Sequence, residues 1–259
     1  MSTAPGTDLV LQERRDGVLT VTINRPAQKN AVNHTVAVQL AAAMDLLDAD
    51  PELSVGVLTG AGGVFSAGMD LKAFAKGELP VIAGRGFGGF TRAEVRKPLI
   101  AAVEGWALGG GFEMVLACDL IVAAEDARFG LPEVTRGLVA TEGGLIRLPR
   151  SLPQHVAARV LLTGEPLTAA EAKQFGLVNE LAPPGTALDA AREMAGRVAR
   201  NAPLALGAVK DVLRGTQTLS LSDAFARQDE LTGGLATSED AREGVLAFAE
   251  KRAPVWRGR

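Results

Sequence analysis

A buried strand, a glycine-rich turn and a helix start follow one another in residues 99–117, and this succession constrains the fold more than any other stretch. The apolar run Leu99–Val103 predicts a short buried strand. Gly109–Gly111 then precede Phe112–Ala117, which has the composition of a helix. The first N–H groups of a helix lack intrahelical acceptors, and glycine lets another backbone or a ligand oxygen come close. The stretch therefore suits an oxyanion site or, more simply, a tight strand-to-helix connection.

Glu113 adds a titratable group to this turn. It stands three residues after Gly110, so on a helix it projects from about the same side as the free N–H groups. A carboxylate and an anion-stabilising donor would then flank one small volume. A glutamate in a first helical turn is also favoured by the helix dipole alone, so this stretch by itself leaves both interpretations open.

The composition indicates a globular protein and gives no sign of a polyanionic partner. Of 259 residues, 47% are hydrophobic and 22% charged, and the net charge is −3. Such a chain can bury a substantial core, and neither nucleic acid nor an anionic membrane is favoured as a partner. The single cysteine excludes an intramolecular disulfide and suits a reducing compartment. With no apolar stretch near the ~20 residues of a membrane span and no secretion signal in Met1–Gly6, we expect a cytoplasmic protein.

The rest of the chain is predicted to be α/β for about two thirds of its length and then mostly helical. Alternating residues predict a hairpin over 9–13 and 18–24, and Asn33 is a plausible N-cap for a helix reaching residue 48. Residues 77–89 suit a mobile, irregular lid. Further strands are expected at 55–59, 120–123 and 177–180, and helices at 156–162, 169–175, 187–200, 204–214, 223–231 and 239–249.

Several common catalytic motifs fail on particular residues. Gly63–Gly68 has the spacing of a phosphate-binding P-loop, but Met69-Asp70 stands where Lys and Ser/Thr are required. Gly60-Ala61-Gly62 begins a dinucleotide fingerprint, yet Phe65 occupies the third small position. The chain has only two histidines and no metal-ligand spacing. General acid–base chemistry would therefore depend on carboxylates.

The pattern that remains resembles the crotonase superfamily, and within it most resembles the enoyl-CoA hydratases. The matching segments occur in family order over essentially the full length. They are Asn24-Arg25-Pro26 with Asn30-Ala31, Phe65–Leu71, Gly109–Glu113, Ala117-Cys118-Asp119, Phe129–Glu133, Gly143-Gly144 before Arg147-Leu148-Pro149, and Phe248–Arg252. The resemblance implies an α/β spiral of strand–strand–helix turns over residues 1–196, which holds the CoA thioester site, and a helical trimerisation region over residues 197–259. It also implies a homotrimer or a dimer of trimers.

The resemblance assigns roles to individual residues. The N–H groups of Met69 and Gly110 would hold the thioester carbonyl and stabilise the charge that develops on it, by typically ~3 kcal/mol per donor. Glu113 would be the base on water and Glu133 the proton donor to Cα, kept protonated by burial and its like-charged neighbour. A capping or salt-bridging carboxylate is the structural alternative for Glu133. Other substrate contacts are expected from Lys29, Ala67, Asp70, Leu71, Pro132 and, from a neighbouring subunit, Lys251.

These roles imply an enzyme of fatty acid metabolism, a hydro-lyase that adds water reversibly across the 2,3 double bond of a 2-enoyl-CoA. The product would be a 3-hydroxyacyl-CoA, and neither a metal nor a redox cofactor is expected. Two enzymatic alternatives remain, a double-bond isomerase and a specialised hydroxyacyl-CoA dehydratase. A third alternative is a non-catalytic acyl-CoA-binding protein.

One loop departs from the family pattern. Ala140-Thr141-Glu142 stands where the family commonly has Pro-Gly-Ala. Glu142 is expected either as an additional acid near the water site, as in related dienoyl-CoA isomerases, or as an ordinary first-turn helix residue. In the suspected lid, Arg85, Phe87 and Phe90 are expected to influence the acyl pocket.

Overall fold

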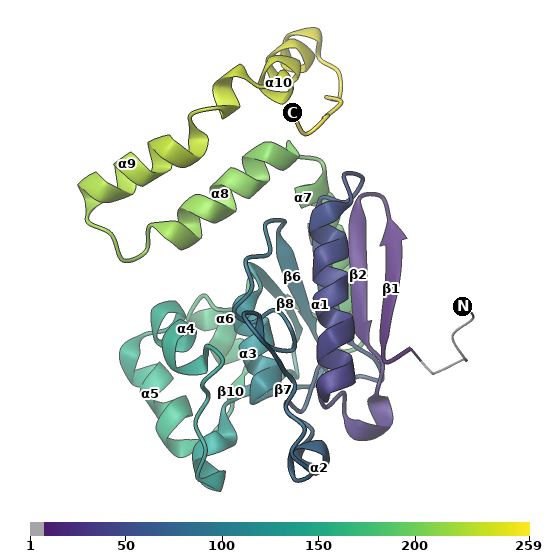
Figure 1. Cartoon of the computed structure of the whole chain (residues 1–259), viewed down its shortest axis with the longest axis vertical. Helices are drawn as coiled ribbons and strands as arrows, with labels where there is room; N and C mark the ends of the chain where they lie inside the picture. The colour runs from purple at the N-terminus through teal and green to yellow at the C-terminus, as the bar shows by residue number, and fades with distance from the viewer. Residues whose placement is uncertain (1–7) are drawn as a thin grey trace.

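A six-stranded sheet forms the centre of the molecule in the computed structural model, which describes residues 8–259 (Figure 1). Its strands lie in the order β1-β2-β3-β6-β8-β11, and β1 is antiparallel to β2 while the others run parallel. The strands are β1 (Val10–Arg15), β2 (Val18–Ile23), β3 (Val55–Gly60), β6 (Leu99–Val103), β8 (Leu120–Ala124) and β11 (Glu180–Ala182). The predicted hairpin and the strands predicted at 55–59, 99–103 and 120–123 are confirmed.

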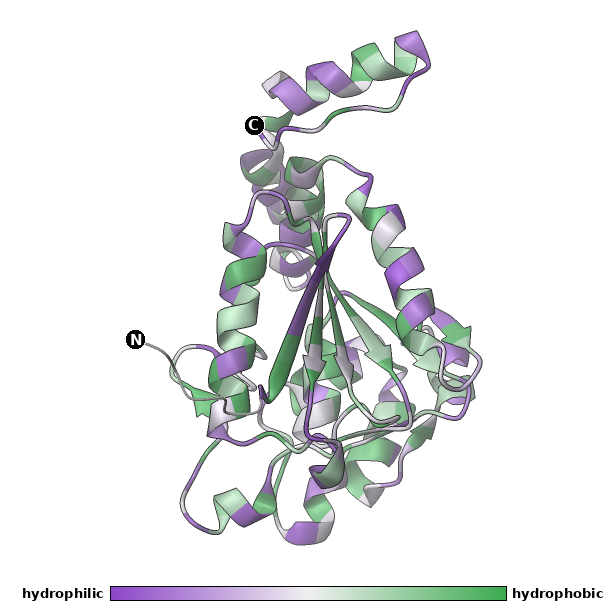
Figure 2. Cartoon of the chain, turned by 90° about the vertical axis from the view of Figure 1, so that its right-hand side faces the viewer, coloured by the Kyte–Doolittle hydropathy of each residue, from purple (hydrophilic) through white to green (hydrophobic). Residues whose placement is uncertain are grey.

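Side-chain alternation along the strands builds a core on each face of the sheet. Val57 packs in one cluster with residues of α7 (Ala187–Ala199), whereas its neighbour Leu58 packs in the other with residues of α1 (His34–Ala49) and α3 (Gly110–Ala117). Helices α1 and α7 accordingly lie on opposite sides of the sheet in Figure 1. The edge strand β1 is mostly exposed and largely hydrophilic in Figure 2. The predicted N-cap is confirmed, because the Asn33 side chain accepts a hydrogen bond from the Val36 N–H.

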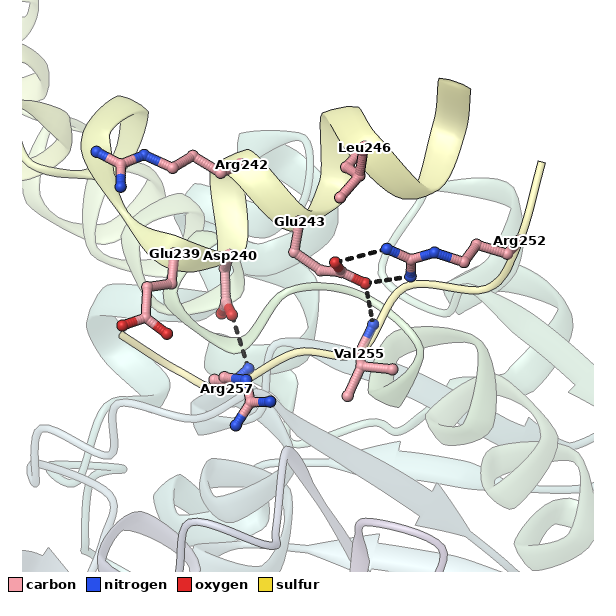
Figure 3. Close-up of a pocket in the computed structure, with 8 residues that line it drawn as sticks. All are labelled: Glu239, Asp240, Arg242, Glu243, Leu246, Arg252, Val255 and Arg257. Carbon is pink, nitrogen blue, oxygen red and sulfur yellow. Dashed lines mark hydrogen bonds and ion pairs between the residues drawn. The ribbon is translucent and has the colours of Figure 1, made fainter. Parts of the chain in front are cut away.

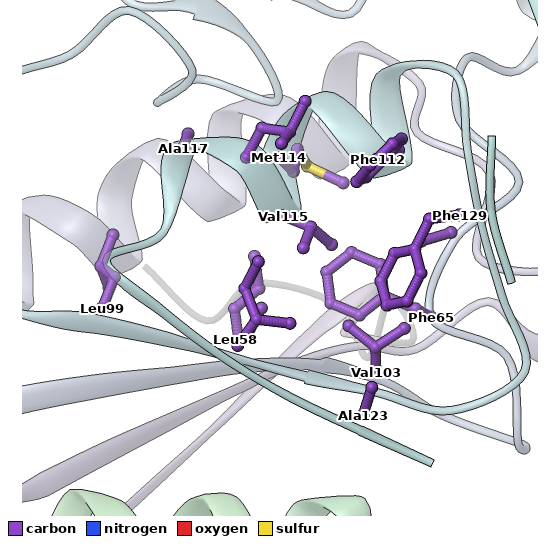
Figure 4. Packing of buried hydrophobic residues seen from close by; sticks show 14 of the residues in the cluster. Leu58, Phe65, Leu99, Val103, Phe112, Met114, Val115, Ala117, Ala123 and Phe129 are labelled. Carbon is purple, nitrogen blue, oxygen red and sulfur yellow. The ribbon is translucent and has the colours of Figure 1, made fainter. Parts of the chain in front are cut away.

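Three neighbouring strands of the sheet, β3, β6 and β8, are each followed by a second extended segment and then a helix. This repeat gives the chain its spiral. After β6 comes β7 (Trp106–Leu108) and then α3, and after β8 comes β9 (Arg128–Gly130) and then the short helix η2 (Pro132–Arg136). After β3, Ser66 forms a single bridge to Ala107 before α2 (Leu71–Phe74). β7 and β9, with β10 (Leu167–Thr168), make a second, smaller sheet. Phe112 and Phe129 pack between the layers, their ring centroids 5.3 Å apart (Figure 4).

The C-terminal helices extend beyond one end of the sheet (Figures 1 and 2). Lys210 ties α8 to the core, since its buried ammonium group lies 2.7 Å from the Asp119 carboxylate and donates to the Lys97 carbonyl. Helix α7 continues past residue 196 to residue 199, and the domain boundary at 196 stays a prediction. The other helices are η1 (Pro26–Gln28), α4 (Gly144–Ser151), α5 (Gln154–Thr163), α6 (Ala169–Gln174), α8 (Pro203–Gly215), α9 (Leu221–Thr232), η3 (Leu235–Thr237) and α10 (Glu239–Glu250).

Two local predictions were wrong. The strand expected at 177–180 begins only at Glu180, because the N–H groups of Leu177 and Val178 both donate to the Ala172 carbonyl and close helix α6 instead. The lid expected at 77–89 is not wholly irregular, since Val81–Ile82 (β4) and Gly86–Phe87 (β5) form a small hairpin. Among residues 8–259, no helix is long and apolar enough to cross a lipid bilayer.

Candidate active site

Equivalent positions in the three spiral turns converge on one region. Ser66 pairs with Ala107, and Ala107 pairs with Phe129, all in parallel register. Three positions further along each segment stand Met69, Gly110 and Pro132. Gly110 and Pro132 begin helices, and Met69 directly precedes the N-cap of α2. Strand pairing therefore places three helix starts side by side.

The two predicted oxyanion turns contact each other through Gly68. Its φ is +85°, and a Cβ there would lie 2.5 Å from the Leu108 carbonyl oxygen and 3.1 Å from the Gly110 nitrogen. Only glycine tolerates both the conformation and the close approach. Within residues 8–259 neither the Met69 N–H nor the Gly110 N–H has a backbone acceptor. Two unpaired donors from separate turns thus lie close to one another.

Glu113 is buried in the first turn of α3, with a relative exposure of 3%. Its Oε1 accepts hydrogen bonds from the Glu142 N–H (2.7 Å) and the Gly144 N–H (2.9 Å). The pKa of Glu113 is raised to about 7, chiefly by burial and also by the charge of Glu133, while the two N–H donors oppose the rise. A group with this pKa changes its protonation state near neutral pH, as a general base or acid must.

Glu133 presents a second, partly buried carboxylate to the same turn. A Cβ on Gly109 would lie 3.2 Å from Glu133 Oε1, so this carboxylate lies against the start of α3. Its Oε2 is buried without a hydrogen-bond partner in the described part of the chain. Burial raises the pKa of Glu133. A buried, unpaired oxygen does not fit a capping or salt-bridging role, and such an orphan usually marks a functional position.

A network of side-chain hydrogen bonds stabilises the turn that contains Met69. Arg25 donates to the Asp70 carboxylate (3.0 Å) and also to the Ala31 carbonyl. The buried Asn30 side chain donates to the Val64 carbonyl, and Ser66 Oγ donates to the Asn30 carbonyl while it accepts from the Gly68 N–H. Arg25 therefore supports the fold of this turn.

The predicted substrate contacts fall into two groups. Lys29, Ala67, Asp70 and Leu71 lie together, because the Ala67 N–H donates to the Lys29 carbonyl and the Asp70 carboxylate caps α2, which begins at Leu71. Lys251 lies at the end of α10, at the opposite end of the molecule from α2 (Figure 1). Within one chain it is remote from this region, and its role from a neighbouring subunit stays a prediction.

Sequence reasoning named Phe87 as an influence on the acyl pocket but missed two contacts around the site. The N–H groups of Glu142 and Gly144, which bind Glu113, come from a loop 29 and 31 residues away. Phe87 packs against Gly110, because a Cβ on Gly110 would lie 2.4 Å from the Phe87 ring. The glycines flanking Phe87 were the available signal, since a cluster of glycines often marks close packing of backbone segments.

A separate hollow lies between α10 and the C-terminal tail (Figure 3). The acidic side chains that line it already have partners within the chain. Glu243 pairs with Arg252 and accepts a hydrogen bond from the Val255 N–H, and Asp240 accepts one from the Arg257 N–H. These contacts fasten the tail to α10. No cluster of three metal-ligating side chains occurs within residues 8–259.

Comparison with known proteins yields one family. The family model described as enoyl-CoA hydratase/isomerase matches residues 13–259. A 2,3-dehydroadipyl-CoA hydratase from Escherichia coli is 40% identical over 96% of this chain and 99% of its own length. A carnitinyl-CoA dehydratase from Salmonella arizonae is 43% identical over 95% of this chain and 97% of its own length.

Solved structures agree with the sequence matches. The crystal structure of an enoyl-CoA hydratase from Mycobacterium marinum superposes with a TM-score of 0.95 at 56% identity, over 97% of this chain and 99% of that one. The structure of an enoyl-CoA hydratase from Mycobacterium tuberculosis gives a TM-score of 0.95 at 55% identity, with the same coverage of 97% and 99%. The predicted α/β spiral fold is thereby confirmed, whereas the oligomerisation role of the C-terminal helices stays a prediction.

Proposed function

This chain belongs to the enoyl-CoA hydratase/isomerase family, and we infer that it adds water reversibly across the 2,3 double bond of a 2-enoyl-CoA to give a 3-hydroxyacyl-CoA. Its relatives are named as hydratases and dehydratases, which are hydro-lyases that act on CoA thioesters. The observation that carries the proposal is the pair of glutamates, Glu113 buried and Glu133 partly buried, with raised pKa values beside two unpaired backbone N–H groups.

The N–H groups of Met69 and Gly110 are proposed to bind the thioester carbonyl oxygen. When water adds to Cβ, electron density moves through Cα onto this oxygen, which becomes an enolate. Fixed donors aimed at the developing charge stabilise that state more than the ground state. The close approach of Gly68 to Gly110 supports the assignment, because it holds the two donors next to each other.

Glu113 is proposed as the base that takes a proton from water, and Glu133 as the donor that delivers a proton to Cα. Hydrogen bonds to a carboxylate favour its charged form, and Glu113 Oε1 accepts two of them. Glu133 Oε2 accepts none in the described part of the chain, so burial favours its protonated form. The difference between the two environments supports this division of roles.

The proposal includes no metal and no redox cofactor. The thioester carbonyl already makes Cβ electrophilic, and the addition changes no oxidation state overall. Two proton transfers and stabilisation of one oxyanion complete the reaction. Lys29, Ala67, Asp70, Leu71 and Pro132 are proposed to bind the rest of the thioester, in a cytoplasmic enzyme.

A homotrimer or a dimer of trimers is part of the proposal, with Lys251 reaching the CoA of a neighbouring subunit. Large apolar side chains are exposed on the C-terminal helices, which suits an interface between copies. They include Val209, Leu213, Leu221, Phe225, Val245, Leu246 and Phe248.

The test is hydration of crotonyl-CoA and longer 2-enoyl-CoAs, followed by loss of absorbance of the conjugated double bond. We expect turnover by the unsubstituted protein and a loss of about 10²–10⁴-fold in kcat for Glu113→Gln and for Glu133→Gln, the usual contribution of one acid or base. A non-catalytic acyl-CoA-binding protein would instead bind the thioesters tightly, show no turnover, and be unaffected by the double substitution.

A 3-enoyl-CoA substrate separates the isomerase from the hydratase. An isomerase would shift the double bond without incorporating water, so the position of the double bond and the oxygen content of the product decide between them. The side chain of Glu142 argues against a third acid at the water site, because both of its oxygens accept hydrogen bonds from Arg92.

A further inference from the structure

The carboxylate of Glu142 accepts hydrogen bonds from residues 87–92, a segment about fifty residues earlier in the chain. Its Oε2 accepts hydrogen bonds from the Phe87 N–H (2.9 Å), Thr91 Oγ1 (3.3 Å) and Arg92 Nε (3.1 Å), and its Oε1 accepts from Arg92 Nη2 (2.8 Å). The side chain of Glu142 is 14% exposed and that of Arg92 is 57% exposed. We call the contacts between Glu142 and residues 86–92 the Glu142 clamp.

The backbone around the clamp is shaped to admit it. Gly86 has a φ of +77°, and a Cβ there would lie 2.6 Å from Glu142 Oε2 and 2.5 Å from Thr91 Oγ1. A larger residue at this position would push the carboxylate away. Arg147 adds a second tie between the same segments, because its guanidinium donates to the Thr91 carbonyl (2.6 Å) and to the Glu142 carbonyl (3.4 Å).

The clamp connects two parts of the candidate active site. At one end, the Glu142 N–H donates to Oε1 of Glu113. At the other end, the gripped segment carries Phe87, which is 4% exposed and packs its ring against Gly110. A thioester carbonyl bound at the Gly110 N–H would lie next to this ring. The position of the Phe87 ring therefore limits the space beside the reacting carbons.

We propose that Glu142 is a positioning residue whose carboxylate, held by Arg92, fixes Phe87 over Gly110 and thereby restricts the length of acyl chain that the site accepts. This inference rests on the proposed function, because it assumes that an acyl-CoA thioester binds at Gly110. Glu142 does not touch the substrate. It acts through Phe87, which is the specificity-determining side chain.

The test compares the affinities of butanoyl-CoA and dodecanoyl-CoA by calorimetric titration. Both are saturated thioesters, so the measurement needs no turnover. Arg92→Ala, Glu142→Ala and Phe87→Ala are each expected to improve binding of dodecanoyl-CoA relative to butanoyl-CoA by at least about tenfold, the change expected if two further methylene groups become buried. The double variant Arg92→Ala/Glu142→Ala should match the single variants, because both substitutions open the same clamp.

Arg197→Ala is the matched control. The Arg197 side chain is 54% exposed, close to the 57% of Arg92, and pairs with Glu180 at 3.3 Å. This pair joins α7 to β11 and involves none of the candidate site residues, so its loss should leave the affinity ratio unchanged. The exposed Arg92 side chain makes Arg92→Ala the variant that is expected to fold without difficulty. A lowered melting temperature with an unchanged ratio in both Arg92→Ala and Glu142→Ala would overturn the inference and leave Glu142 a purely structural residue.

Turnover distinguishes this failure from failure of the proposed function. If the unsubstituted protein hydrates enoyl-CoAs but the variants keep its chain-length ratio, only the clamp inference is wrong. If the unsubstituted protein binds neither thioester, the proposed function is wrong and the inference with it.

Discussion

Burial decides what an ordinary glutamate can do at this site. Glu113 is buried and Glu133 is partly buried, and the pKa of each is raised as a result. Two N–H donors partly compensate the charge of Glu113, whereas Glu133 Oε2 has no donor within residues 8–259. The same residue type thus acquires two different proton affinities from two different surroundings.

The raised pKa of Glu113 predicts a pH-dependent stability. The folded state binds this proton more tightly than the unfolded state, so the free energy of unfolding falls as pH rises from 4.5 to about 7. Glu113→Gln keeps an oxygen acceptor for both N–H donors but does not titrate. Across this window the unsubstituted protein should lose about 3 kcal/mol relative to the variant.

Urea unfolding of both proteins below pH 4.5 and above pH 7 measures this difference. The comparison between the two removes the contributions of all other titrating groups that they share. Parallel stability curves over the whole range would show that Glu113 titrates normally in the folded protein.

At the scale of elements, the site depends on two turns that touch. Gly68→Ala would place a methyl group 2.5 Å from the Leu108 carbonyl oxygen and force the Met69 and Gly110 turns apart. Loss of one well-aligned donor corresponds to a drop of about 10²–10³-fold in kcat. Steady-state kinetics with crotonyl-CoA measures this drop.

Gly77→Ala is the control for backbone strain alone. Gly77 has a nearly equal φ of +81°, but a Cβ there would have no neighbour within 4 Å. The Gly77→Ala variant should therefore lose some stability and keep the kcat of the unsubstituted protein. An equal fall in kcat for both variants would mean that strain, and not the spacing of the turns, explains the effect of Gly68→Ala.

At the scale of the whole molecule, the C-terminal helices expose apolar surface that a single chain leaves uncovered. Phe248 is 87% exposed and Leu221 75% exposed. If other copies of the chain cover this surface, a charged side chain introduced at Phe248 or Leu221 would have to lose its water when the copies associate, which is energetically costly. Phe248→Glu with Leu221→Glu should reduce the molar mass measured by light scattering to that of a monomer.

Val38→Glu serves as the comparison, because Val38 is 47% exposed on α1, outside the C-terminal helices. It should leave the molar mass unchanged. A monomeric unsubstituted protein would contradict the proposed assembly and with it the proposed role of Lys251 across a subunit boundary.

Local sequence patterns predicted most helices and strands, but not where each one ends and not the shortest strands. Helix α1 was predictable because Asn33 caps it and its apolar residues repeat at helical spacing. The strand expected at 177–180 was wrong because apolar Leu177 and Val178 are buried in either arrangement, and only the competition for the Ala172 carbonyl decides between them. The hairpin of β4 and β5 was missed because each strand has only two residues.

The sequence by itself identified the family through its resemblance, and this resemblance implied the spiral of strand–strand–helix turns and the candidate glutamates, because the segments that carry it are short runs of neighbouring residues such as Gly109–Glu113 and Phe129–Glu133. Only the tertiary structure decided that Phe87 lies on Gly110, that Glu142 grips residues 86–92 and that Glu113 has a pKa of about 7. These properties depend on groups far apart in the chain and on the removal of water between them. Neither the contacts nor the loss of solvent exists until the strands have paired.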